Sequence, residues 1–92
     1  MSIRVNITEW DAVVDELRQF GSSGDVTTDD GWVRLDFGSA YVELSREGWI
    51  STGMPLHEFE QDGLTELTVD HGGGSLTVEA ADTSYTFRRP GG

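Results

Sequence analysis

The sequence predicts an α+β fold in which one strand and one amphipathic helix precede two antiparallel meanders of three strands each, with the helix on one sheet face. Three patterns support this prediction. Apolar and polar residues alternate near the N-terminus, apolar residues then recur at helical spacing, and short alternating runs separated by turn residues follow from about residue 26. All of 1–92 is expected to form one domain, because so short a chain buries only about 60% of its unfolded surface.

The first strand is predicted over residues 3–7. Ile3, Val5 and Ile7 alternate with Arg4 and Asn6, which is the period of a strand with one buried face.

A helix is predicted over residues 9–20. Thr8 is a favourable N-cap, Glu9 and Asp11 place negative charge in the first turn, and Gly21 ends the helix. Apolar residues recur at helical spacing at Trp10, Val13, Val14, Leu17 and Phe20.

The first meander is predicted over about 26–55 and contains the clearest hairpin. Gly38-Ser39 suits a two-residue type II′ turn. This turn would pair Phe37 with Ala40, Leu35 with Val42 and Val33 with Leu44, all apolar, and on the other face Arg34 with Glu43 and Asp36 with Tyr41. Opposite charges therefore meet across the strands, which supports the register.

The turn after this hairpin leaves one question open. If the loop at Arg46-Glu47-Gly48 holds two residues rather than three, Trp49 and Ile50 exchange faces. Pro55 closes the meander, and 56–63 is predicted to be a connector with room for a short helical turn.

The second meander is predicted over about 64–89, with a glycine-rich loop at residues 71–75 and a flexible tail at 90–92. Its apolar positions are Leu67, Val69, Leu76, Val78, Tyr85 and Phe87. The two meanders resemble one another at an offset of about 35 residues, through either a duplication or the common pattern of strands and turns.

Charge sets the expected surroundings of the protein. Seventeen acidic residues oppose six arginines, no lysine is present, and the net charge is −11. Molar salt screens such self-repulsion, so we expect a cytoplasmic protein of a halophile that attracts salt cations without specificity. The same charge disfavours nucleic acid and anionic membranes.

No arrangement typical of an enzyme or a cofactor site is found in the sequence. Cysteine is absent, His57 lacks a partner motif, and Gly72-Gly73-Gly74 is not followed by the helix that a phosphate site needs. Paired acids such as Asp29-Asp30 lack the spacing of a calcium loop. We therefore expect a non-enzymatic protein without a cofactor or a specific metal.

Aromatic residues and an arginine mark a candidate interaction surface. In the predicted register Trp32, Arg34 and Tyr41 share the second face of the first meander, joined by either Trp49 or Ile50. Aromatic residues and arginine are enriched at protein interfaces. One interpretation is that this face is simply covered, by the second meander or by a twin subunit. The other is that it docks another protein. A homodimer would satisfy both interpretations.

Two resemblances complete the sequence analysis. The acidic, lysine-free composition resembles that of small haloarchaeal proteins. The terminal Gly91-Gly92 resembles the end of ubiquitin-like modifiers, including small archaeal modifier proteins, which implies a conjugation tail with Gly92 as the activated residue. The predicted order of strands and helix departs from that family, whose domains begin with a hairpin before the helix. Pro90 would also stiffen the tail.

Overall fold

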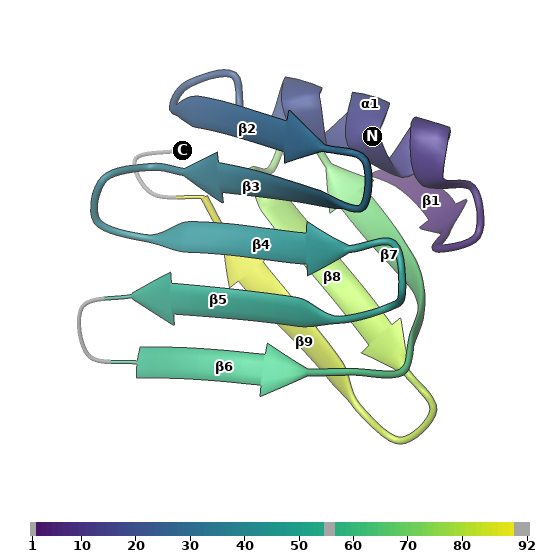
Figure 1. The fold of residues 1–92 in the computed structure, drawn as a ribbon. Helices are drawn as coiled ribbons and strands as arrows, with labels where there is room; N and C mark the ends of the chain where they lie inside the picture. Colours follow the sequence, from purple (N-terminus) through teal and green to yellow (C-terminus); the bar gives the residue numbers. More distant parts are fainter. Residues whose placement is uncertain (1, 55–56, 90–92) are drawn as a thin grey trace.

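Two antiparallel sheets facing one another, with one helix, make up the protein (Figure 1). The structure is a computed structural model that describes residues 2–54 and 57–89. The α+β class is confirmed. The predicted flexible tail at 90–92 lies outside the described residues.

The N-terminal strand and the helix form where the sequence predicts them. Strand β1 spans Ser2–Asn6 and helix α1 spans Trp10–Phe20. The predicted N-cap was wrong: Glu9 is the capping residue and makes no side-chain cap bond, while the Thr8 hydroxyl donates to Asn6 Oδ1 at 2.7 Å. Asn6 also accepts the Thr8 amide at 2.9 Å, so the local turn occupies the side chain that would have capped the helix.

The first sheet has five strands in sequential order, β2-β3-β4-β5-β6. They are β2 Asp25–Asp29, β3 Trp32–Asp36, β4 Tyr41–Ser45, β5 Ile50–Met54 and β6 His57–Gln61. The prediction of three strands therefore missed β2 and β6, and the connector predicted at 56–63 was wrong because residues 57–61 pair with β5. Both missed strands lie at sheet edges, where only one neighbour is needed.

The register of the β3–β4 hairpin is the one that its Gly-Ser turn predicts. Leu35 pairs with Val42 and Arg34 with Glu43, while the Phe37 amide donates to the Ala40 carbonyl at 2.8 Å. Gly38 has a φ of +88°, and no described non-glycine residue has a positive φ. A type II′ turn needs this conformation at its first central position.

The second sheet has the order β1-β7-β8-β9. Its later strands are β7 Leu64–Asp70, β8 Ser75–Ala80 and β9 Ser84–Arg88, which together form the predicted second meander. Strand β1 joins it by pairing antiparallel with β7. The layout thus differs from the prediction, in which β1 belonged to neither meander.

The sequence predicts that the helix covers one sheet face; in the structure α1 instead contacts strands of both sheets, namely β1, β3 and β7. Figure 1 shows it along the β2 side of the molecule. One continuous apolar core lies between the sheets and this helix. Its fully buried members are Val13, Leu17, Phe20, Val33, Leu35, Val42, Leu44, Ile50, Leu67, Val69, Leu76 and Phe87.

Ring contacts and one arginine connect the layers at their margins. Phe59 of β6 stacks on Tyr85 of β9 with ring centroids 4.2 Å apart, which joins the edge strands of the two sheets. Arg89 donates to the Phe20 carbonyl at the end of α1 at 2.9 Å and to the His71 carbonyl at 3.3 Å. Arg89 therefore satisfies a carbonyl at the helix C-terminus that has no partner within the helix.

One like-charged pair lies on the outer face of the four-stranded sheet. Glu66 of β7 is directly opposite Glu79 of β8. A hydrogen bond between the two carboxyl groups, assisted by desolvation and by the charge of Glu66, raises the pKa of Glu79 above its ordinary value of 4.5. At neutral pH the two groups repel one another.

We expect Glu79→Gln to raise the free energy of unfolding near neutral pH, because the amide removes this repulsion and can donate to Glu66. The raised pKa means that the stabilising contribution of Glu79 is complete below its unfolded pKa and is lost as pH rises through the folded value. The gain should therefore disappear below about pH 4. Urea unfolding at both pH values measures it, with Glu47→Gln in an exposed turn as the control. An equal gain at both pH values would contradict this assignment.

Candidate functional site

The loop between β4 and β5 places Trp49 on the outer face of the five-stranded sheet. Ile50 pairs with Leu44 and is fully buried, so its neighbour Trp49 points the other way. The Ser45 amide donates to the Trp49 carbonyl at 2.8 Å, and Gly48 has a φ of +93°. The loop therefore holds three residues, 46–48, which decides the question that the sequence left open.

A row of two tryptophans flanking a serine results. Trp32 of β3 pairs with Ser45 of β4, and Ser45 faces Trp49 across the next loop. Both tryptophans are half-buried. We call Trp32, Ser45 and Trp49 the tryptophan row; its central side chain is much smaller than the two that flank it.

Arg34 and Tyr41 lie beside this row and pack on one another. The guanidinium carbon of Arg34 lies 4.2 Å from the centroid of the Tyr41 ring, and Arg34 Nη1 is 3.0 Å from Glu43 Oε1. The Tyr41 hydroxyl lies 3.3 Å from Ser51 Oγ, and its ring covers Gly53 on β5. These contacts hold the arginine and the ring against one another and against β5.

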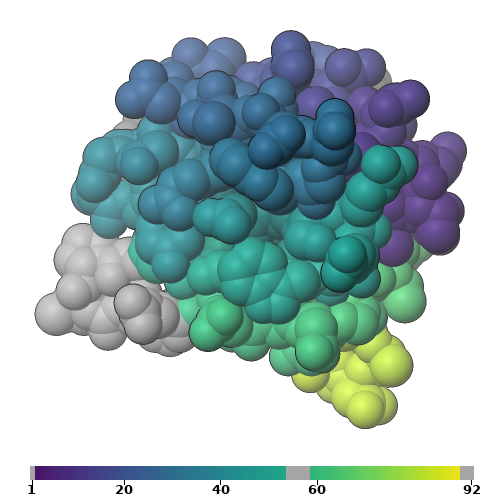
Figure 2. All heavy atoms as spheres, in the orientation of Figure 1, coloured from purple at the N-terminus to yellow at the C-terminus, as the bar shows by residue number. Residues whose placement is uncertain are grey.

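The structure therefore brings together Trp32, Arg34, Tyr41 and Trp49, the four residues proposed from the sequence. The four-stranded sheet packs on the opposite, inner face, so the interpretation in which the second meander covers these residues was wrong (Figure 1). Figure 2 shows the outer face, formed by β2 to β6.

Gly53 tests the packing of this face. A Cβ at Gly53 would fall inside the Tyr41 ring, so Gly53→Ala forces Tyr41 and Arg34 to move. We expect a loss of about 1–3 kcal/mol in the free energy of unfolding. Gly31→Ala is the matched control, because no atom lies within 4 Å of a Cβ built there. Equal effects of the two substitutions in denaturant unfolding would contradict the described packing.

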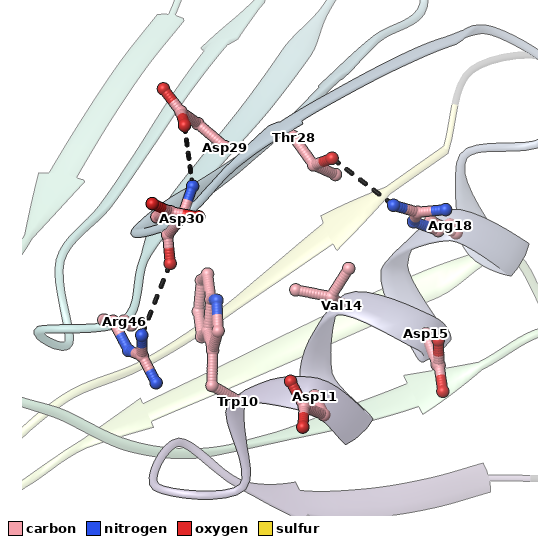
Figure 3. Close-up of a pocket in the computed structure, with 9 residues that line it drawn as sticks. All are labelled: Trp10, Asp11, Val14, Asp15, Arg18, Thr28, Asp29, Asp30 and Arg46. Atoms are coloured by element: carbon pink, nitrogen blue, oxygen red, sulfur yellow. Dashed lines mark hydrogen bonds between the residues drawn. The ribbon is translucent and has the colours of Figure 1, made fainter.

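A second concave surface lies between α1 and the β2–β3 hairpin (Figure 3). This groove has a volume of about 500 Å³ and continues past Trp10 and Arg46 into a hollow of about 340 Å³. It is lined by Trp10, Asp11, Val14, Asp15, Arg18, Thr28, Asp29, Asp30 and Arg46. We call it the helix–hairpin groove.

The walls of this groove carry unpaired carboxylates. Among the described residues, none of its four aspartates forms an ion pair, and of their side-chain carboxylates only that of Asp29 accepts a hydrogen bond, from the Asp30 amide at 2.8 Å. The arginines make weak contacts: Arg18 donates to Thr28 Oγ1 and Arg46 to the Asp30 carbonyl, both at 3.4 Å. Four aspartates and two arginines give the lining a formal charge of −2.

Trp10 forms part of the groove and keeps a polar group without a partner. The side chain rises from the first turn of α1 between the helix and Asp30, with its indole nitrogen on the groove side (Figure 3). Trp10 is only 7% exposed, and within the described chain its indole N–H makes no hydrogen bond. Among the described residues only Thr52 Oγ1 is a buried side-chain polar atom without a partner, so the Trp10 N–H is open to the groove and takes its acceptor from there.

From the sequence alone, the groove residues are expected to be core and solvated surface. Trp10 recurs with the apolar stripe of the helix, and Asp11 and Asp29 are far apart along the chain. The remaining signal was a large aromatic residue at the helix start beside Asp11 and Asp15, four residues apart, which places both acids on one helix flank.

Other sequence candidates have different outcomes. His71, expected as a plain loop residue, lies with its Nε2 2.7 Å from Glu16 Oε1 on α1. Asp70 holds the glycine loop by accepting the Gly73 amide, which lowers the pKa of that carboxyl. The proposed conjugation residues Gly91 and Gly92 lie outside the described part of the chain, as does the side chain of His57.

Within residues 2–54 and 57–89, no three histidine or acidic side chains converge on a position for a metal ion. No helix in this part of the chain has the length and apolar character needed to cross a bilayer.

Comparison of the chain with models of protein families, with curated proteins and with solved structures found no match. The functional argument therefore depends on the geometry of these two surfaces.

Proposed function

We propose that the protein is a non-enzymatic interaction module of a high-salt cytoplasm that forms a homodimer through the outer face of its five-stranded sheet. The observation that carries this proposal is the tryptophan row: two half-buried tryptophans stand on either side of Ser45 on a face that no described element covers. Tryptophan and arginine contribute most often to the binding energy of protein interfaces.

The shape of the row suits contact between two identical copies. In a two-fold interface the same patch meets itself, so each ridge needs a matching hollow. Here a tryptophan of one copy would pack over the small Ser45 side chain of the other. Arg34 and Tyr41, already packed on one another, would form the flank of the same patch.

Charge on this face makes the proposed association depend on salt. Asp36, Glu43 and Glu60 lie on the outer face or its margin, while Arg34 supplies one positive charge. Two copies therefore repel one another in dilute buffer. At molar salt the Debye length falls to about 3 Å, which removes most of this repulsion and leaves aromatic burial to stabilise the dimer.

We expect Trp32→Glu to convert the dimer into a monomer at molar salt, with unchanged far-ultraviolet circular dichroism, as measured by light scattering after size-exclusion chromatography. Ser45→Gln should have the same effect without a change in charge, because its longer side chain would stand where the partner's tryptophan packs. Thr86→Glu, exposed on the other sheet, is the matched control and should remain dimeric.

Two results would contradict this proposal. One is a monomeric wild-type protein at every salt concentration. The other is a dimer that weakens as salt rises, since that dependence would indicate an interface held by opposite charges.

A further inference from the structure

The helix–hairpin groove presents two kinds of unmatched polar group. Asp11, Asp15, Asp29 and Asp30 form no ion pair in the described chain, and the Trp10 indole N–H has no acceptor although the residue is only 7% exposed. A bound molecule that satisfied both would gain interactions that the protein alone does not make.

The chemistry of these groups restricts the ligand. A metal ion or a polyamine would match the aspartates but leave the Trp10 donor without an acceptor. A free anion would match Trp10, Arg18 and Arg46 but would face four carboxylates on a protein of net charge −11. A peptide with a basic side chain carries both partners, because its main-chain carbonyls accept hydrogen bonds and its cation pairs with carboxylates.

The shape of the groove also suits a chain segment. It continues along the helix past Trp10 into a second hollow bounded by Thr8, Glu9, Ala12 and Arg46, so it is longer than a single compact ligand needs. Its hairpin wall includes the end of β2, which is an edge strand of the five-stranded sheet. Grooves between a helix and a sheet edge are a recurring place for extended peptides to bind.

We propose that the helix–hairpin groove binds a short extended segment of a partner protein that carries arginine or lysine. The basic side chain lies between the helix aspartates and Asp29-Asp30, and the Trp10 indole N–H donates to a carbonyl of the segment. Arg18 and Arg46 give further donors near the two ends of the groove. This inference is independent of the proposed dimer, which uses another surface.

Fluorescence anisotropy tests the proposal with a labelled, capped pentapeptide in which two arginines alternate with three glycines. The measurement uses the full chain at the lowest salt at which circular dichroism shows it folded. We expect saturable binding of the arginine peptide and none of a peptide with the neutral analogue citrulline in place of arginine. Absence of arginine-peptide binding, or equal binding of both peptides, would overturn the proposal.

Variants of the groove locate the binding. Asp15→Asn combined with Asp29→Asn should weaken binding about tenfold, since one exposed charge pair contributes up to about fivefold. Trp10→Phe keeps the ring and removes the donor, and should weaken binding about fivefold. Asp82→Asn, in the exposed β8–β9 turn, is the matched control and should bind like the wild type.

Two further measurements separate the alternatives. Spermidine should displace the peptide only at much higher concentration, because it offers no carbonyl to Trp10; displacement at equal concentration would reject the peptide in favour of any polycation. The Trp32→Glu variant should bind the peptide unchanged even where it abolishes the dimer. Loss of peptide binding in that variant would place the segment on the sheet face instead and overturn the proposal.

Discussion

The register of the β3–β4 hairpin is the constraint on which both surfaces depend. Gly38 takes a positive φ at the turn, and pairing from there places Val33 and Leu35 in the core. A slip of one residue would turn these side chains outward and bring Trp32 and Arg34 inward. Because the inner face packs on a second sheet, that alternative would bury a charge and expose much of the core, so the register is strongly specified.

The helix gives the protein its second candidate surface because it lies at the side of the two sheets and contacts strands of both. Arg89 and the pair formed by His71 and Glu16 attach its second half to the β7–β8 loop and the end of β9. Its first turn instead faces the end of β2, across the groove that Trp10 lines. The second half of α1 is therefore attached to the four-stranded sheet, while the groove lies beside its first turn.

Strong local patterns made part of this structure predictable. The β3–β4 register, α1 and the strands of the second meander follow from alternation, helical spacing and turn residues. Strands β2 and β6 were missed because edge strands bury little: β6 places one large aromatic residue, Phe59, against the core, and β2 consists of Thr, Asp and a single Val. The sheet face on which Trp49 lies depends on the length of the β4–β5 loop, and that length is fixed by the pairing of β4 with β5.

For the same reason, the sequence predicted which residues of the sheet face lie together but did not predict the groove. Trp32, Arg34 and Tyr41 belong to one hairpin, so local pairing was enough to place them together. The groove joins Asp11 and Asp15 on the helix to Asp29 and Asp30 on the hairpin, and its existence depends on where the helix packs. That packing is set by contacts with β1, β3 and β7 together, which a local pattern does not contain.

The acidic surface acts in opposite directions on the two proposed interactions. On the sheet face like charges meet, so screening by salt strengthens association, whereas in the groove opposite charges meet and screening weakens binding. A protein with a net charge of −11 in molar salt is therefore suited to bury aromatic surface and to hold basic segments only briefly. Tighter binding in the groove would have to come from groups that salt screens least, the partly buried Trp10 donor above all. The indole N–H, rather than the number of aspartates, would then decide which segments the groove retains in concentrated salt.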